Sequence, residues 1–315
     1  MKIFQVLKQG FLTTVQDLGR FGFLRHGVPI SGAMDTFSFV VANLLVSNDP
    51  NAAGLETTLV GSELQVLTST DIAITGGESS PEVNHNAIPM WQSISVQKGD
   101  IISFGRMKSG CRSYIAVRGG IKTPLVLGSR STYLRGGFGG FAGRQLKAGD
   151  TLEGFAAQPL RFEYKTPVSF IPQFLNDLTV HVTLGPQESM FTEKGIHTFL
   201  SNPYKITLEA DRMGLRLEGQ IIERQSGADI ISDALLPGAI QVPRNGKPIV
   251  LMRDAQTTGG YPKIAVVVEY DLTVLGQAKP NDMLWFSRIT LEEAHRKLRQ
   301  YRGLLNNLSR SLIKK

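Results

Sequence analysis

The sequence predicts a mainly β protein with two barrel-like halves, and three observations lead to this prediction. Short apolar runs rich in Val, Ile, Phe and Tyr recur along the chain, each bracketed by Gly, Asp, Asn or Pro, which is the pattern of strands joined by turns. The 33 glycines and 15 prolines suit tight turns better than long helices. A Pro-rich stretch without periodicity, residues 155–172, separates two sets of these runs.

The expected strands follow one another at the short spacing typical of barrels. They cover residues 64–67, 72–75, 101–104, 114–117, 180–184, 249–252 and 264–268. Turn dipeptides stand just before three apolar segments: Gly99-Asp100, Gly149-Asp150 and Asn281-Asp282. We therefore expect a first β-barrel subdomain over residues 1–165, a second over residues 166–289, and a C-terminal helix over residues 290–315.

Helices are expected to be few. Residues 35–46 are one candidate, with Asp35 as the N-cap, and residues 188–193 are a short second one. The C-terminal segment is the clearest helix: it is amphipathic and basic, and it opens with the capping box Thr290-x-x-Glu293. Its apolar residues recur every three or four positions and share one face. We expect this face to dock onto the body of the chain, and docking onto another chain is the alternative.

The charge distribution argues against nucleic acid as the main partner. The chain carries a formal charge of +7, and the segment from Arg288 onward holds eight Lys or Arg and two acids, so it accounts for nearly all of this excess. A basic segment of this kind is more often the solvated face of a helix than a binding site for nucleic acid. No run of 18 apolar residues and no secretory leader pattern is present. We expect a cytoplasmic protein that does not bind membranes.

Several common motifs are absent. The chain has no Walker phosphate loop and only one cysteine, Cys111, which excludes an internal disulfide and a zinc site built from cysteines. The five histidines show no ligand spacing, so no metal site is expected. Residues 137–142 fit G-x-G-x-x-A without a clear preceding strand. These glycines are expected to allow a sharp bend or a close approach of the backbone to a ligand.

Polar, charged and glycine residues gather in four segments between the expected strands: 13–35, 118–132, 211–219 and 238–262. Arg offers a bidentate fork for a carboxylate or phosphate, and Gly-rich turns offer backbone N–H groups to an oxyanion. Asp can act as a base, and Gln can read an amide with its donor and acceptor. Together they suit a small, partly anionic substrate with an amide-like carbonyl. The alternative is that they form ordinary turns with structural ion pairs, for example between Arg212 and Glu218.

The candidate site residues are taken from these four segments. The candidate catalytic residues are Asp17 and Asp254, as bases or substrate positioners. The candidate substrate-binding residues are Gln16, Arg20, Asp35, Arg118, Arg130, Ser131, Arg212, Gln241, Gln256, Thr257, Gly259 and Tyr261.

The four segments also carry a family resemblance. TTVQDLGRFGFLRHGVPISGAMD, RSYIAVRGGIKTPLVLGSRST, DRMGLRLEG and GAIQVPRNGKPIVLMRDAQTTGGYPKIA occur in this order. With them the chain, over roughly residues 3–288, resembles the allophanate-hydrolase subunit 2 family. This family is also called biotin-dependent carboxyltransferase-like or the C component of 5-oxoprolinase, and it includes the KipI antagonist KipA.

The resemblance implies a fold of two cyclophilin-like β-barrel subdomains. It also implies a C component that works with a KipI-like B component and an A component as a 5-oxoprolinase, which hydrolyses 5-oxo-L-proline to L-glutamate. ATP would be used by the complex, at a site that cannot be located in this chain, and the isolated chain is expected to be inactive.

Two alternatives remain under the same resemblance. The chain could be a regulator that binds a KipI-like inhibitor of a sporulation histidine kinase. It could instead be a urea-type carboxyltransferase component, in which case biotin would have to arrive on another protein, because the chain lacks a Met-Lys-Met acceptor.

Overall fold

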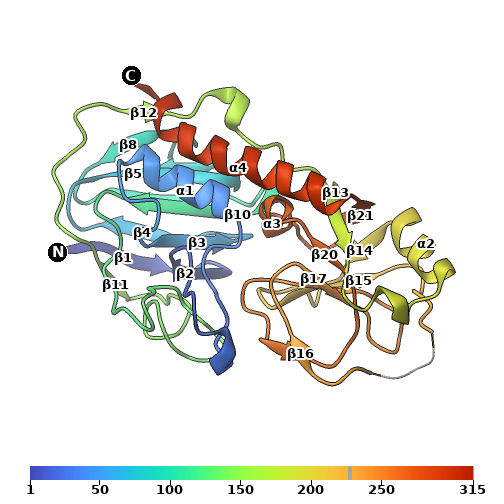
Figure 1. Cartoon of the computed structure of the whole chain (residues 1–315). Helices are drawn as coiled ribbons and strands as arrows, with labels where there is room; N and C mark the ends of the chain where they lie inside the picture. Colours follow the sequence, from blue (N-terminus) through green and yellow to red (C-terminus); the bar gives the residue numbers. More distant parts are fainter. Residues whose placement is uncertain (226–228, 315) are drawn as a thin grey trace. The chain divides into compact units, whose positions relative to one another are not determined.

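The computed structural model describes residues 1–225 and 229–314, and the chain divides into two compact units (Figure 1). Unit 1 contains residues 1–21, residues 31–174 and the C-terminal segment from Leu305. Unit 2 contains Gly22–Ile30 and Leu175–Leu304. The mainly β prediction is confirmed, because strands form the framework of both units.

Unit 1 contains two antiparallel sheets whose apolar residues form one core. This core includes Phe4 and Leu64 from one sheet and Ile72 and Ile115 from the other, all at most 1% exposed. The six-stranded sheet has the order β11 (Thr151–Glu153), β1 (Lys2–Lys8), β4 (Glu63–Val66), β9 (Ile101–Phe104), β6 (Pro81–Val83) and β7 (Asn86–Ala87). The five-stranded sheet has the order β2 (Leu12–Gln16), β3 (Gly54–Thr58), β10 (Ser109–Val117), β5 (Thr70–Glu78) and β8 (Ser93–Val96).

Helix α1 (Thr36–Leu45) packs against β5 and β10 of the five-stranded sheet (Figure 1). Its start is fixed as predicted, because the Asp35 carboxylate accepts a hydrogen bond from the Ser38 backbone N–H at 3.0 Å. Eight of its residues are buried, so the helix has little solvated surface and closes one side of unit 1.

Unit 2 is a closed seven-stranded barrel. The order is β13 (Asp177–Leu184), β20 (Lys263–Val267), β17 (Ala239–Gln241), β18 (Ile249–Leu251), β15 (Gly214–Glu218), β14 (Tyr204–Ile206) and β21 (Met283–Arg288). The parallel pair β13–β21 closes the barrel, and the other pairs are antiparallel. A short ribbon of β16 (Asp233–Ala234) and β19 (Thr258–Gly259) lies outside the barrel order. Closure leaves the barrel without free strand edges.

Two short helices accompany the barrel. Helix α2 (Glu193–Ser201) contributes Phe199, whose ring stacks on Phe286 of β21 at 4.4 Å between centroids. The short helix predicted at residues 188–193 is instead one 3-10 turn, Glu188–Met190, followed by the start of α2. Helix α3 (Glu269–Gly276) was not predicted, because its weak amphipathic pattern continues directly from the apolar strand β20.

The C-terminal helix α4 (Leu291–Ser311) begins at the predicted capping box. The Glu293 N–H donates to Thr290 Oγ1 at 3.2 Å, and the Thr290 N–H donates to Glu293 Oε2 at 2.9 Å. Tyr301 and Leu308 are buried within the chain, so the expectation that the apolar face docks onto the body is confirmed. A short strand β22 (Ile313–Lys314) follows and pairs with β12 (Tyr164–Lys165).

One type of turn recurs three times at the predicted turn dipeptides. In each, the closing Asp accepts a hydrogen bond from the backbone N–H three residues earlier, at 2.7, 2.7 and 3.0 Å for Asp100, Asp150 and Asp282. The preceding Gly99, Gly149 and Asn281 have φ of 98°, 91° and 76°, a left-handed backbone that Gly and Asn tolerate. Two of these turns lie in unit 1 and one in unit 2.

No helix within the described part of the chain is long and apolar enough to cross a membrane.

Candidate functional site

The predicted site residues divide evenly between the two units. Unit 1 holds Gln16, Asp17, Arg20, Asp35, Arg118, Arg130 and Ser131, and unit 2 holds Arg212, Gln241, Asp254, Gln256, Thr257, Gly259 and Tyr261. The structure therefore groups them into separate clusters, which are described unit by unit.

Asp17 is the centre of the unit 1 cluster. Its side chain follows β2, is 3% exposed, and receives hydrogen bonds on both oxygens. Oδ1 accepts from the Gly19 N–H at 2.8 Å, from the Ser129 hydroxyl at 2.7 Å and from the Ser131 hydroxyl. Oδ2 accepts from the Arg130 N–H at 2.6 Å. Asp17 thus ties the turn after β2 to residues 129–131, using uncharged donors.

Arg20 is buried next to this hydrogen-bond network around Asp17, with 1% exposure. It donates to the Ser131 carbonyl and lies over the Phe138 ring at 5.0 Å. Gly139 makes room for it: a Cβ there would lie 2.1 Å from the Ser131 carbonyl oxygen and 2.7 Å from Arg20 Nη2. Gly139 therefore permits a close approach of this loop to the backbone at Ser131, a protein contact in place of the predicted approach to a ligand.

Gln16 is buried at the end of β2. Its Nε2 donates to Thr14 Oγ1 at 2.9 Å and to the Thr132 carbonyl at 3.3 Å. Its Oε1 and the buried Ser31 hydroxyl have no hydrogen-bond partner among residues 1–225 and 229–314. Gln16 therefore keeps an amide acceptor that the described protein groups do not use.

Asp35 belongs to a second buried network in unit 1. Its carboxylate caps α1, and its backbone N–H donates to Tyr114 Oη at 2.8 Å. The Tyr114 hydroxyl in turn donates to Glu56 Oε2 at 3.0 Å. Burial first, and then the carboxylates of Glu56 and Asp35, raise the pKa of Tyr114 well above its usual value. In this network Asp35 orders the start of the helix.

Arg118 and Arg130 use their guanidinium groups differently. Arg118 donates to the Val46 carbonyl at 2.8 Å and to the Ser47 carbonyl, so it caps the C-terminal end of α1. Arg130 is half-buried, and its guanidinium lies over the Phe155 ring at 5.1 Å. No hydrogen bond or ion pair of this guanidinium occurs within the described residues. The Arg130 guanidinium therefore keeps donors that the described residues do not use.

The second predicted catalytic carboxylate, Asp254, forms a buried ion pair in unit 2. Arg212 Nε donates to Asp254 Oδ2 at 2.9 Å and Nη2 donates to Oδ1 at 3.2 Å, and both side chains are 4% exposed. The expected pairing of Arg212 with Glu218 is wrong: Glu218 pairs with Lys247 at 3.1 Å. The reason is topological, because the Asp254 N–H also donates to the Arg212 carbonyl, which brings the two loops together.

The other predicted residues of unit 2 lie around one end of strands β17 and β20. Gln241 is 1% exposed, and its Nε2 donates to the Tyr261 carbonyl at 3.1 Å. Gly259 lies close to it, and a Cβ there would lie 2.8 Å from Leu235 Cδ1 and 3.0 Å from Gln241 Nε2, so these side-chain ends would have to shift. Thr257 is also buried, and its carbonyl accepts a hydrogen bond from the Leu235 N–H at 2.9 Å. Gln256, the residue before it, is exposed.

Lys263 is a site residue that the sequence patterns did not indicate. It pairs in register with Gln241 across β17 and β20, and its ammonium is buried. Nζ donates to Asp233 Oδ2 at 2.5 Å and to the Ala234 carbonyl at 3.0 Å. The Lys263 N–H donates to Gln187 Oε1 at 3.2 Å. The available signal was a lysine directly before the apolar run 264–268, at a position where a strand residue is often buried.

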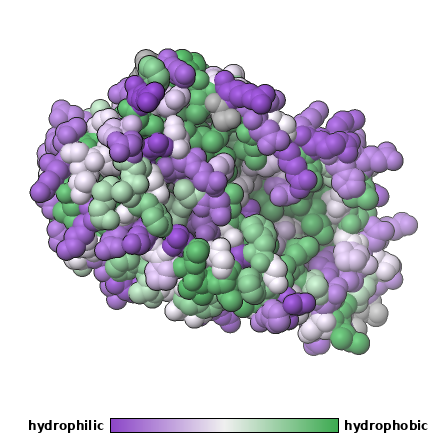
Figure 2. Space-filling model, turned by 60° about the vertical axis from the view of Figure 1, so that its left-hand side comes forward, coloured by the Kyte–Doolittle hydropathy of each residue, from purple (hydrophilic) through white to green (hydrophobic). Residues whose placement is uncertain are grey.

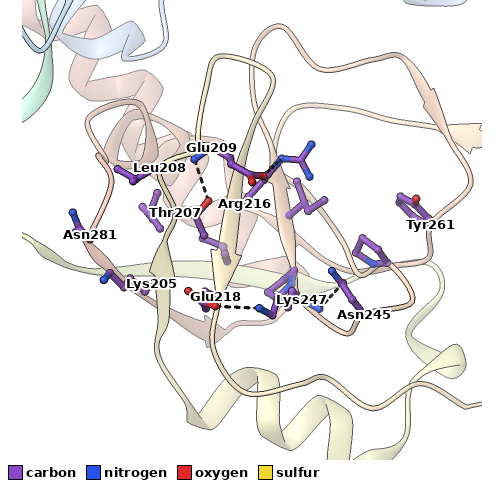
Figure 3. Close-up of a pocket in the computed structure, with 15 residues that line it drawn as sticks. Lys205, Thr207, Leu208, Glu209, Arg216, Glu218, Asn245, Lys247, Tyr261 and Asn281 are labelled. Atoms are coloured by element: carbon purple, nitrogen blue, oxygen red, sulfur yellow. Dashed lines mark hydrogen bonds and ion pairs between the residues drawn. The ribbon is translucent and has the colours of Figure 1, made fainter.

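A groove of about 710 Å³ lies elsewhere on the barrel, over the outward-facing residues of β14, β15 and β18 (Figure 3). Two ion pairs border it, Arg216 with Glu209 at 3.3 Å and Lys247 with Glu218 at 3.1 Å. Tyr261 is the one predicted site residue that lines this groove. The groove and the clusters around Asp17 and Asp254 are therefore different features.

No group of three or more His, Cys, Asp or Glu side chains within the described residues could hold a metal ion.

Known proteins are similar to this chain in sequence and in fold. A model of the carboxyltransferase domain, subdomains A and B, matches residues 26–288. The C subunit of 5-oxoprolinase from Escherichia coli (strain K12) is 39% identical over 290 residues, 92% of each chain, and that of Haemophilus influenzae is 34% identical over 302 residues, 96% of each chain. The crystal structure of the K. lactis urea amidolyase superposes with a TM-score of 0.92 at 34% identity, over 97% of this chain and 20% of that one.

Matched segments, overall fold and nearly complete coverage therefore agree with the resemblance stated above. The chain belongs to the carboxyltransferase-domain family of subdomains A and B, which includes proteins named as the C subunit of 5-oxoprolinase.

Proposed function

We propose that this chain is the C component of a bacterial ATP-dependent 5-oxoprolinase, which hydrolyses 5-oxo-L-proline to L-glutamate together with the A and B components. The observation that carries the proposal is the likeness to two proteins named as the C subunit of 5-oxoprolinase, at 39% and 34% identity over more than nine-tenths of each chain. A likeness this complete leaves no additional domain in either relative to account for a different activity.

The chemistry of the clusters supports this proposal. 5-Oxo-L-proline is a lactam that carries a carboxylate, so its binding site needs amide partners and a cation. Each unit offers such groups: unit 1 has the buried amide of Gln16 and the guanidinium of Arg130, and unit 2 has the buried amide of Gln241 and the ammonium of Lys263. Asp17 and Asp254 are enclosed by donors, so we expect them to position these groups and not to act as bases.

Assembly with partner proteins needs surfaces that bind them. Large apolar side chains are exposed in both units, among them Phe21, Leu125, Leu208 and Ile231 at 60–94% exposure. Figure 2 shows hydrophobic residues beside hydrophilic ones on one face of the molecule. Contiguous apolar patches mark sites of protein association, whereas single exposed apolar side chains are ordinary surface features. We propose a KipI-like B component and the A component of 5-oxoprolinase as the partners, in the cytoplasm.

In this proposal, ATP is a substrate of the assembled enzyme. The chain has no Walker motif, so we assign the ATP site to the complex and not to this chain on its own.

A urea-type carboxyltransferase component is the second candidate. The TM-score of 0.92 with the K. lactis urea amidolyase favours it. The ureido group of biotin and a lactam both present N–C=O, so the same buried glutamines suit either molecule. Biotin would have to arrive on another protein, and avidin would then abolish the activity. The regulatory alternative, binding of a KipI-like kinase inhibitor, requires the same partner as the enzyme and stays a proposal.

The test is ATP-dependent release of glutamate from 5-oxo-L-proline by the purified A, B and C components, with each omitted in turn. We expect release only when all three are present, and no effect of avidin. Undiminished release without this chain would overturn the proposal. Release that avidin blocks would favour the carboxyltransferase alternative.

A further inference from the structure

Lys263 is unusual for a lysine because its side chain is 6% exposed in the barrel of unit 2. Burial of an ammonium is unfavourable unless it is paired and hydrogen-bonded. Both conditions are met by Asp233 Oδ2 at 2.5 Å and the Ala234 carbonyl at 3.0 Å. The Lys263 ammonium is therefore bound to both residues of β16, Asp233 and Ala234.

The two members of this ion pair differ in their exposure. The Asp233 side chain is 47% exposed, and it lies on a ribbon strand of two residues. Its hydrogen bond from Lys263, followed by that from the Ala234 N–H, lowers the pKa of Asp233. The Lys263 side chain is thus enclosed by the protein, whereas the short Asp233 side chain borders solvent and can turn into it by rotation.

The neighbours of the pair are suited to an amide. Gln241 lies opposite Lys263 on the adjacent strand and is buried. Gln187 donates to Asp233 Oδ2 at 3.3 Å and accepts from the Lys263 N–H. A molecule with a carboxylate on Lys263 would thus lie beside two side-chain amides, which can bind an N–H and a C=O.

We propose that Lys263 binds the carboxylate of the substrate and that Asp233 holds this place until the substrate arrives. On binding, the substrate carboxylate replaces the Asp233 carboxylate at Nζ, and Asp233 turns toward solvent. The exchange replaces one charge-assisted hydrogen bond by another, so the ammonium stays paired throughout. The ligand class is a small carboxylate that also carries an amide, and its identification as 5-oxo-L-proline rests on the proposed function.

The proposal and a purely structural role predict different effects of removing Asp233 on the affinity for carboxylates. If the ion pair only ties the ribbon to the barrel, loss of either partner weakens the protein and never improves binding. If Asp233 competes with the substrate, its removal must increase the affinity for carboxylates.

The experiment uses the complete enzyme of three components and measures KM and kcat for 5-oxo-L-proline. In Lys263→Met we expect KM to rise about 10- to 100-fold, as for loss of a hydrogen bond to a charged group. In Asp233→Ala we expect KM to fall about threefold or more. The neutral analogue 5-oxo-L-prolinamide, used as a competitive inhibitor, should lose no more than about twofold in affinity in Lys263→Met.

The matched control is Lys247→Met, which removes a lysine of the same barrel whose partner Glu218 is solvent-exposed. It should leave KM unchanged. Thermal unfolding checks that each variant is folded, and if Lys263→Met is not, Asp233→Ala decides the question alone.

The outcomes separate the two proposals. A wild-type complex that releases no glutamate contradicts the proposed function, and the assignment of this substrate to Lys263 with it. An active wild type whose KM is unchanged in folded Lys263→Met, or unchanged or raised in Asp233→Ala, overturns the inference while the proposed function stands.

Discussion

The two units each bury an aspartate in a loop rich in glycine and charge, but they satisfy it in different ways. In unit 1, Asp17 receives two hydroxyls and two backbone N–H groups. In unit 2, Asp254 receives a bidentate guanidinium from Arg212. The direct donors to Asp17 are all uncharged, whereas the Asp254 carboxylate is paired directly with a cation.

This difference shows how one residue type can stabilise two loops by different physics. Several neutral donors share the cost of a buried carboxylate, so the loss of one is moderate. When a single charged partner compensates the buried carboxylate, loss of that partner leaves the carboxylate charge unpaired. The predictions below test the contrast.

Arg212→Met should have the largest effect. It leaves Asp254 buried without its cation, so we expect a loss of about 3–5 kcal/mol in the free energy of unfolding. Urea denaturation followed by the fluorescence of Trp285, which lies in β21 of unit 2, measures it. The double variant Arg212→Met/Asp254→Leu should recover most of this loss, and a single-variant loss below about 1 kcal/mol would contradict the ion-pair account.

Asp17→Asn should cost less, about 2 kcal/mol. Asparagine keeps one acceptor oxygen, but its NH₂ group faces donors, and the Arg130 N–H or a hydroxyl is left unpaired. Denaturation followed by Trp91, which is buried in unit 1, measures the loss. Ser129→Ala, which removes one donor of four, is the control and should cost less than Asp17→Asn. An equal cost would mean that the donors do not share the charge.

Asp150→Asn should cost about 1 kcal/mol at pH 7, because Asp150 and Arg144 are partly solvated. The hydrogen bonds from Arg144 lower the pKa of Asp150 from its usual 3.8. A lowered carboxyl pKa stabilises the fold above the unfolded value, and this stabilisation is lost as the pH falls through the folded value. The difference between wild type and variant should therefore be full at pH 7 and shrink below about pH 4. A difference independent of pH between 7 and 3 would refute it.

Tyr204→Phe should have the smallest effect, within about 0.5 kcal/mol of wild type. Burial raises the pKa of Tyr204 to about 12, and its hydroxyl has no hydrogen-bond partner in the part of the chain that the structure describes. Tyr114→Phe in unit 1 is the matched comparison, and it should cost about 1–3 kcal/mol because Glu56 and the Asp35 N–H lose a partner. Equal costs for the two tyrosines would contradict this contrast.

Local patterns were sufficient to predict much of the fold. Each of the seven apolar runs coincides with a strand, although three of them extend one residue past its end. The Asp35 N-cap and the Thr290 capping box are formed as expected. These features depend on residues within a few positions of one another.

The site was harder to predict, because its partners are distant in sequence. Arg212 and Asp254 are 42 residues apart, and Lys263 and Asp233 are 30 apart. The nearer Glu218 was the natural guess for Arg212, and β15 presents its side chain to solvent instead. Periodicity does not indicate which buried charges meet, since that depends on strand order in the barrel.

The division of the chain into units restricts how the chain can be divided or joined to other domains. Gly22–Ile30 lie near the start of the chain but belong to unit 2, whereas the segment from Leu305 onward belongs to unit 1. The shortest continuous piece that contains all of unit 1 is therefore the whole chain. A single cut in the chain therefore cannot separate the two units. We expect proteins that contain this chain as one domain among others to contain all of it without interruption. The K. lactis urea amidolyase agrees with this expectation, because it matches 97% of the present chain as one-fifth of its own.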